Sequence, residues 1–94
     1  MIKVHAFISG RVQGVGFRFF TKQKARSLKL SGWVRNRLDG RVELEVIGKP
    51  EAIDKLISWL YQGSPLSWVD NIEIVERVAV SQYFPGLFKV KPTS

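Results

Sequence analysis

The stretch with the clearest chemical potential is the nine-residue segment GRVQGVGFR, residues 10–18. Gly10, Gly14 and Gly16 lack a Cβ, so the backbone can adopt positive φ angles and approach a ligand closely. Successive N–H groups in such a turn converge on one point and form a nest for an anion. A helical pattern begins at Phe17, and the first turn of a helix adds unpaired N–H groups and the positive end of its dipole. The segment is therefore predicted to cradle an anion, with phosphate as the natural occupant.

Arg18 carries a permanent positive charge at the start of the predicted helix. A cation there opposes the helix dipole at a cost of about 0.3–1 kcal/mol, and a bound anion would reverse that sign. Arg18 is therefore a candidate ligand, whereas Arg11 has no such argument and is interpreted as surface charge. The glycine spacing matches neither the dinucleotide fingerprint nor the Walker A loop, because no Gly-Lys-Ser/Thr follows.

Other residues that carry hydrolytic chemistry are sparse in this chain. It has no cysteine and a single histidine, His5, which lacks the partners of a triad or a metal site and is interpreted as a packed or surface side chain. Glu43 and Glu45 lie two residues apart on one predicted strand face and are interpreted as solvated. Asn36, three residues before Asp39, has the position of an ordinary polar residue near a turn.

The elements that must position these residues follow from the periodicity of apolar side chains. The pattern predicts strands over residues 2–9, 33–37, 41–47, 70–80 and 87–90, and helices over 17–28 and 50–61. Asp39-Gly40 predicts a hairpin turn of type I′, in which both central residues have positive φ. We expect Trp68 in a loop, a turn over residues 83–86 and a loose end over 92–94.

The order β-α-β-β-α-β predicts an α+β fold, the ferredoxin-like βαββαβ sandwich with two helices on one face of an antiparallel sheet. Right-handed crossovers then place the first and third strands side by side in the centre. The length of 94 residues predicts one domain over residues 1–94. No segment has the pattern of a signal peptide or a membrane span, so a cytoplasmic protein is the default expectation.

The net charge of the chain indicates anionic partners but does not identify one. Fifteen Lys and Arg against eight Asp and Glu give a formal charge of +7. Such a field attracts phosphorylated metabolites, nucleic acid or an acidic membrane surface.

Two blocks of sequence make a more specific comparison possible. The segment 10–18 is followed by GWVRNRLDGRVE, residues 32–43. Together the two blocks strongly resemble the acylphosphatase family, and the βαββαβ order extends that resemblance over essentially the whole chain.

The resemblance implies hydrolysis of the carboxyl–phosphate bond of small acyl phosphates, without a metal or an organic cofactor. It implies that Arg18 binds the phosphoryl oxygens and that Asn36 orients the attacking water. The residues whose backbone would cradle the phosphoryl group are Val12, Gln13, Gly14, Val15, Gly16 and Phe17. We expect inorganic phosphate to be both product and inhibitor, and the protein to be a monomer without nucleic-acid or membrane partners.

Two alternatives remain open at this stage. The fold and the charge also suit an RNA-recognition module, although the third strand, residues 41–46, carries two carboxylates and no aromatic residue. The chain could instead be an acylphosphatase-like domain that works within a larger assembly, such as one handling a carbamoyl phosphate.

Overall fold

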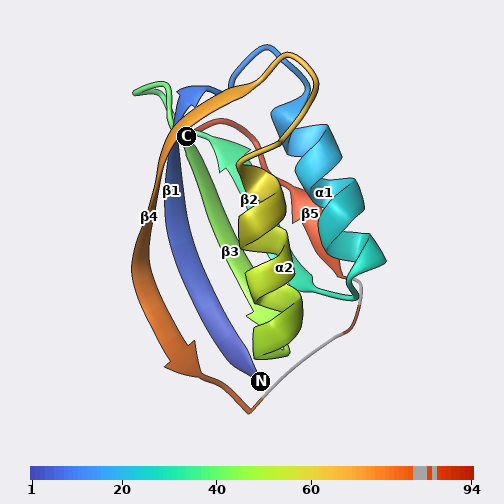
Figure 1. Ribbon diagram of the computed structural model, residues 1–94. Coiled ribbons are helices and arrows are strands. Elements are labelled where there is room, and N and C mark those ends of the chain that lie inside the picture. Colours follow the sequence, from blue (N-terminus) through green and yellow to red (C-terminus); the bar gives the residue numbers. More distant parts are fainter. Residues whose placement is uncertain (82–84, 86) are drawn as a thin grey trace.

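A five-stranded sheet with two helices on one face forms the framework of the molecule (Figure 1). The computed structural model describes residues 1–81, 85 and 87–94. The elements are β1 (Ile2–Arg11), α1 (Phe17–Ser27), β2 (Ser31–Asn36), β3 (Val42–Gly48), α2 (Pro50–Leu60), β4 (Trp68–Ala79) and β5 (Phe88–Val90). The strands lie in the order β4-β1-β3-β2-β5, which confirms the ferredoxin-like class and the central pairing of the first and third strands.

The core lies between the central strands and the helices. In the antiparallel β1–β3 pair, Val4 lies opposite Val46 and Ala6 lies opposite Leu44, and all four side chains are fully buried. Alternation along each strand sends these residues to the helix side of the sheet, as the period of two predicts.

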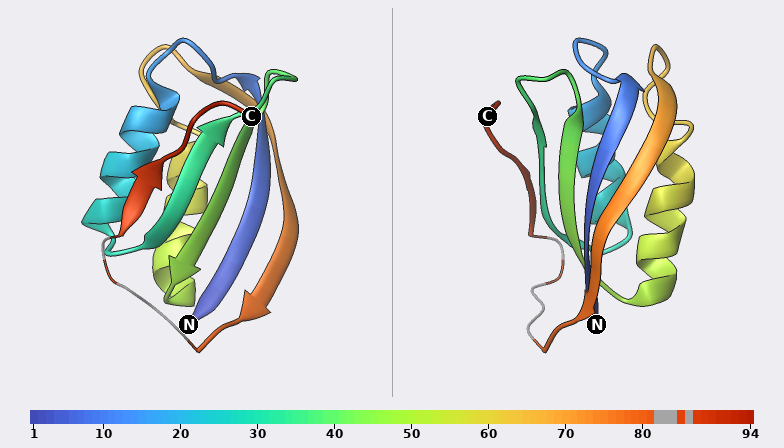
Figure 2. Two further views of the ribbon diagram at one scale, coloured as in Figure 1. Left: turned by 180° about the vertical axis from the view of Figure 1, so that it is seen from behind. Right: turned by 90° about the vertical axis from the view of Figure 1, so that its left-hand side faces the viewer.

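Both helices turn their predicted apolar stripes toward this core. The buried residues are Phe17, Thr21 and Ala25 in α1, and Ile53, Leu56 and Leu60 in α2. Viewed from behind, the strands lie in front of both helices, so the opposite face of the sheet has no helix over it (Figure 2). Within the part of the chain that the structure describes, no helix combines the length and apolar character needed to cross a bilayer.

The edge strand β4 departs from simple alternation because its pairing with β1 contains two irregularities. The register shifts between His5 and Ala6 and again between Ser9 and Gly10. A bulge adds a residue to one strand, so side chains beyond it change face. At the second shift a Cβ on Gly10 would lie 2.1 Å from the carbonyl oxygen of Trp68. β4 begins at Trp68, so the prediction that Trp68 lies in a loop was wrong.

The C-terminal part of the chain is more ordered than expected. β5 pairs with β2 in parallel, so the sheet is antiparallel apart from this added strand. Beyond β5, Ser94 N–H donates to the carbonyl of Asn36 over 3.1 Å, and Leu38 N–H donates to the carbonyl of Ser94 over 3.1 Å. The prediction of a loose end at 92–94 was therefore wrong, because the tail bonds to the end of β2. The turn predicted over 83–86 falls on residues of which only Pro85 is described.

The β2–β3 hairpin has a three-residue loop where a type I′ turn was predicted. Arg37 N–H donates to the carbonyl of Arg41 over 2.8 Å, and Gly40 N–H donates to the carbonyl of Arg37 over 3.2 Å. Gly40 has a φ of 95°, but Asp39 does not have a positive φ. This is a turn over residues 37–40 whose last residue is a glycine with positive φ, the usual form of a three-residue hairpin loop. Only one residue therefore needs the conformation that glycine favours.

Candidate functional site

The predicted cradle is the loop that joins β1 to α1. β1 ends at Arg11 and α1 begins at Phe17, so the loop lies at one end of the sheet (Figure 1). Gly14 has a φ of 73° and Gly16 a φ of 76°, a region that L-residues with a Cβ rarely adopt. No atom lies within 4 Å of a Cβ built on Gly14, so this backbone faces open space. The loop therefore has the conformation that an exposed set of N–H groups requires.

The start of α1 carries no internal compensation for its dipole. Gly16 is the N-cap, no side chain caps the helix, and the first turn holds no acidic residue. Instead it holds Arg18, which is half-buried. The Arg18 side chain forms no hydrogen bond or ion pair with the described residues. A cation and uncapped N–H groups at one helix end produce a region of positive potential that favours an anion.

Asn36 reaches the same region from a different element. It is the last residue of β2, and the residue is only 8% exposed. Its side-chain Oδ1 is buried and accepts no hydrogen bond from the described residues. An unpartnered buried acceptor costs about 1–3 kcal/mol, and such groups recur where a ligand or water is bound. Asn36 is therefore poised to accept a hydrogen bond from a bound molecule.

One pocket brings these features together. Its volume is about 220 Å³, and its walls comprise Val12, Gly14, Gly16, Phe17, Arg18, Phe19, Asn36 and Val90. Six of the eight residues predicted for the site thus share one pocket. Gln13 and Val15 do not line it, because the Gln13 side chain contacts the hairpin and Val15 packs against the core.

Two pocket residues were not predicted from the sequence, Phe19 and Val90. Phe19 lies off the apolar stripe of α1 and is 51% exposed. An aromatic residue on the polar side of a helix, next to Arg18, is a signal that sequence reasoning could have used. Val90 gave no such signal, because only the parallel pairing of β5 with β2 brings it to the site.

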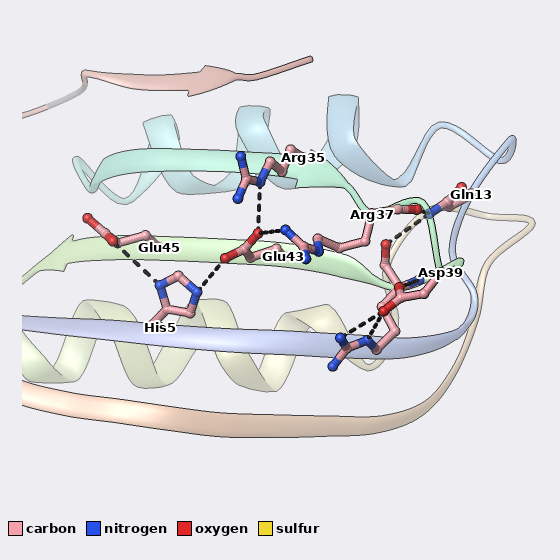
Figure 3. A network of polar contacts seen from close by, with 8 residues as sticks. His5, Gln13, Arg35, Arg37, Asp39, Glu43 and Glu45 are labelled. Atoms are coloured by element: carbon pink, nitrogen blue, oxygen red, sulfur yellow. Dashed lines mark hydrogen bonds and ion pairs between the residues drawn. The ribbon is translucent and has the colours of Figure 1, made fainter. Parts of the chain in front are cut away.

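The Gln13 side chain ties the glycine loop to the hairpin that follows Asn36. Its Nε2 donates to the carbonyl of Arg37 over 2.8 Å and to the carbonyl of Arg41 over 2.9 Å. These two carbonyls belong to the residues that close the β2–β3 loop. The contact, drawn in Figure 3, fixes the position of the loop relative to the end of β2. Gln13 was predicted to contribute through its backbone, and its side chain adds this second contact.

Replacing Gln13 with methionine should remove both hydrogen bonds at nearly constant side-chain length. Because each carbonyl keeps a backbone donor, we expect a loss of only about 1 kcal/mol in the free energy of unfolding. We expect kcat to fall about tenfold or more, since small displacements of reacting groups are costly. Inhibition by phosphate should change little, because the substitution leaves the loop backbone and Arg18 in place. The exposed Gln23→Met on α1 is the control. Unchanged kcat together with lowered stability would limit Gln13 to a structural role.

On the open face of the sheet, Glu43 forms the centre of an ion-pair network (Figure 3). Its Oε1 accepts hydrogen bonds from Arg35 Nε at 2.7 Å and from Arg37 Nη1 at 3.1 Å, and its Oε2 lies 2.7 Å from His5 Nε2. Glu43 is only 5% exposed, so the interpretation of Glu43 as a solvated residue was wrong. Arg35 and Arg37 flank Asn36 in sequence, so the network holds the end of β2 from the face opposite the pocket.

The network lowers the pKa of Glu43. Burial by itself raises the pKa of this carboxyl, but the hydrogen bonds from Arg35 and His5 and the charges of these residues outweigh it. The pKa therefore lies below its ordinary value of 4.5. As the pH falls, the unfolded chain takes up this proton first. The stabilisation is thus present above the unfolded-state pKa and is lost as the pH falls through the folded-state pKa.

We expect Glu43→Gln to lower the free energy of unfolding by about 1–3 kcal/mol at neutral pH, because it leaves the half-buried guanidinium groups of Arg35 and Arg37 without a charged acceptor. The difference from the parent chain should shrink as the pH drops below 4.5, where the parent loses the same interaction. Urea denaturation across an acid pH series measures this. Glu45→Gln is the control, because its contact with His5 Nδ1 is longer, at 3.5 Å. Equal stability of Glu43→Gln and the parent chain at neutral pH would contradict the role of the network.

The fold and the pocket define an α+β domain with a glycine loop and a cation at one end of its sheet. The sequence pattern of the Acylphosphatase family matches residues 4–88. The acylphosphatase of Chloroflexus aurantiacus is 49% identical over 74 residues, which is 79% of this chain and 80% of that protein. That of Acaryochloris marina is 50% identical over 77 residues, 82% of this chain and 83% of that protein. The chain belongs to the acylphosphatase family.

Solved structures agree with this assignment. The acylphosphatase of Bacillus subtilis superposes with a TM-score of 0.88 at 37% identity, over 97% of this chain and 99% of that chain. A structure of full-length HypF in a phosphate- and nucleotide-bound form matches 99% of this chain with a TM-score of 0.81 at 32% identity. The match covers 12% of the HypF chain, so the same fold also forms one part of a larger protein.

Proposed function

We propose that this acylphosphatase hydrolyses acyl phosphates in the pocket formed by the glycine loop, Arg18 and Asn36. The loop N–H groups and Arg18 hold the phosphoryl oxygens, and Asn36 Oδ1 accepts a hydrogen bond from the attacking water. The observation that carries this assignment is that Arg18 and the unpartnered Oδ1 of Asn36, from two separate elements, line one pocket with Gly14 and Gly16.

The chemistry fits a site without a strong acid or base. The water oxygen attacks phosphorus, and the bond between phosphorus and the acyl oxygen breaks with its electron pair leaving on the carboxylate. The conjugate acid of that carboxylate has a pKa of about 4, so it departs without protonation. Both protons of the water end on the phosphate product, which is released as dihydrogen phosphate. In a loose transition state the nucleophile needs little activation, so positioning and electrostatic stabilisation supply the rate.

Two properties of the reaction follow from these roles. Inorganic phosphate resembles the phosphoryl half of the substrate, so it should inhibit competitively with the acyl phosphate. Each proposed contact comes from the protein itself, so we propose that hydrolysis is independent of metal ions. We also propose that the chain acts as a single-domain monomer in the cytoplasm. Without cysteine it forms no disulfide, so its folding does not require an oxidising compartment.

Initial rates on two substrates test the proposed function. We expect rapid hydrolysis of benzoyl phosphate and slow hydrolysis of a phosphate monoester such as phenyl phosphate. An alkoxide or phenoxide leaving group needs protonation, and the pocket walls hold no acidic side chain that could supply it. Activity on benzoyl phosphate should persist in excess EDTA. Preference for the monoester, or loss of activity with EDTA, would overturn the proposal.

RNA recognition, the alternative from another class, needs aromatic rings free to stack on bases. On the open face of the sheet the ring of Trp33 has Arg35 at 5.0 Å and Lys91 at 4.3 Å, and that of Phe7 has Arg41 at 4.3 Å. Both rings are half-buried. We therefore propose no nucleic-acid partner, and a gel-shift assay with single-stranded RNA at low salt should show no complex.

The larger-assembly alternative has one observation in its favour, the match to one part of HypF. The near-complete mutual coverage with the Bacillus subtilis enzyme favours a free-standing enzyme instead. Activity of the isolated chain on benzoyl phosphate distinguishes the two.

A further inference from the structure

The pocket has a second wall with no part in holding a phosphoryl group. Beyond the glycines, Arg18 and Asn36, it is lined by Val12 and Phe17 at its base and by Phe19 and Val90 at its rim. Val12 and Phe17 are 1% exposed, whereas Phe19 is 51% exposed and Val90 is 39% exposed. The rim therefore presents apolar surface to any molecule bound in the pocket.

The fold explains why both rim residues lie open. Phe88 and Val90 are two residues apart on β5, so they share one face of the sheet. Phe88 is 1% exposed, and Val90 lies where this covered face gives way to the pocket. Phe19 follows Arg18 on the first turn of α1, and its ring lies edge-on against Phe20 with the centroids 5.6 Å apart. Lys22 Nζ lies 5.6 Å from the centroid of the Phe19 ring, and about half of the Phe19 surface stays exposed.

An acyl phosphate has two chemically different halves, and the pocket has two matching halves. The phosphoryl group is held by charge and N–H groups on the polar side. The acyl substituent must then lie against the remaining walls, which carry no polar side chain besides Arg18 and Asn36. A neutral polar acyl substituent would lose hydration against the apolar side chains there, whereas an apolar one would bury surface.

We propose that Phe19 and Val90 form an acyl-binding subsite that selects acyl phosphates with an apolar or aromatic acyl group. This inference rests on the proposed function and adds the class of substrate. The volume of about 220 Å³ lies below the 300–1,000 Å³ typical of drug-sized ligands, so the subsite suits a single ring or a short chain.

The test compares benzoyl phosphate with acetyl phosphate, which share the reacting group and differ in the apolar substituent. The parent chain should have the higher kcat/KM for benzoyl phosphate. In Phe19→Ser the ratio of the two kcat/KM values should fall about tenfold, the low end for apolar groups in an open pocket. Val90→Ser should lower the ratio less, because its side chain is smaller. Leu87 is an apolar residue just before β5, 64% exposed and outside the pocket walls. Leu87→Ser is the matched control and should leave the ratio unchanged.

The outcomes separate this inference from the function on which it rests. Competitive inhibition by inorganic phosphate should be the same in Phe19→Ser as in the parent chain, which would show that the phosphoryl half is intact. If the parent hydrolyses both substrates and Phe19→Ser keeps the parental ratio, the subsite is wrong and the function stands. If the parent hydrolyses neither substrate, the proposed function fails and the subsite fails with it.

Discussion

Replacing Arg18 with glutamine is expected to lower kcat/KM for benzoyl phosphate by about 10²-fold or more, because it removes a preorganised charge from the phosphoryl oxygens. The inhibition constant of inorganic phosphate should rise as well, since Arg18 contacts ground state and transition state alike. Steady-state kinetics with phosphate as competitor measures both quantities. Rates close to those of the parent chain would contradict the role of Arg18 in binding the phosphoryl group.

The free energy of unfolding of Arg18→Gln tests the position of Arg18 independently of the kinetics. In the absence of ligand Arg18 opposes the dipole of α1, whose first turn holds no acidic residue. Its removal should therefore raise the free energy of unfolding by about 0.3–1 kcal/mol. Added phosphate should stabilise the parent chain against heat and stabilise Arg18→Gln much less. Arg11→Gln is the matched control, because Arg11 is exposed at the end of β1, and it should retain both activity and stabilisation by phosphate.

Replacing Asn36 with alanine is expected to lower kcat by about 10²-fold, the size of effect seen when one oriented hydrogen-bonding group is lost from a reacting centre. The proposed role of Asn36 is toward the water, so the inhibition constant of phosphate should change little. This separation of kcat from phosphate binding distinguishes Asn36 from Arg18. A variant with parental kcat, or one that loses turnover and phosphate binding together, would contradict the assignment.

The stability of Asn36→Ala can be predicted from the environment of Asn36 Oδ1. Oδ1 is buried and unpartnered among the described residues, so its removal also removes a desolvation cost. We expect the free energy of unfolding to fall by no more than about 1 kcal/mol. The neighbouring pairing of β2 with β3 uses backbone atoms that the substitution leaves in place. Asn71→Ala, at an exposed position on β4, is the control for a general effect of asparagine loss.

Local patterns in the sequence were sufficient for the elements and their order. The apolar stripe of α1 and the alternation in β3 each depend on a single element facing a single core, which periodicity records directly. Periodicity did not predict the edge strand β4 as well. Its two register shifts against β1 reverse the alternation partway along, and the position of a bulge depends on the partner strand as much as on its own residues.

The candidate site likewise has one part that local sequence predicts and another part that it does not. The glycines, the helix start and Arg18 are contiguous, so the sequence alone predicted an anion cradle with a cation beside it. Asn36 could be linked to that cradle only by resemblance to a family. Its own neighbourhood, three residues before Asp39, predicts nothing beyond a turn.

Sequence by itself therefore determined the elements, the order of the fold and one half of the candidate site, because these depend on contacts within a few residues. Tertiary structure alone decided which distant residues meet. It placed Asn36 and Val90 in the pocket, buried Glu43 beside His5, Arg35 and Arg37, and tied Gln13 to the hairpin. The physical reason is that these contacts depend on strand register and on the parallel addition of β5, and both are set by packing across the whole sheet.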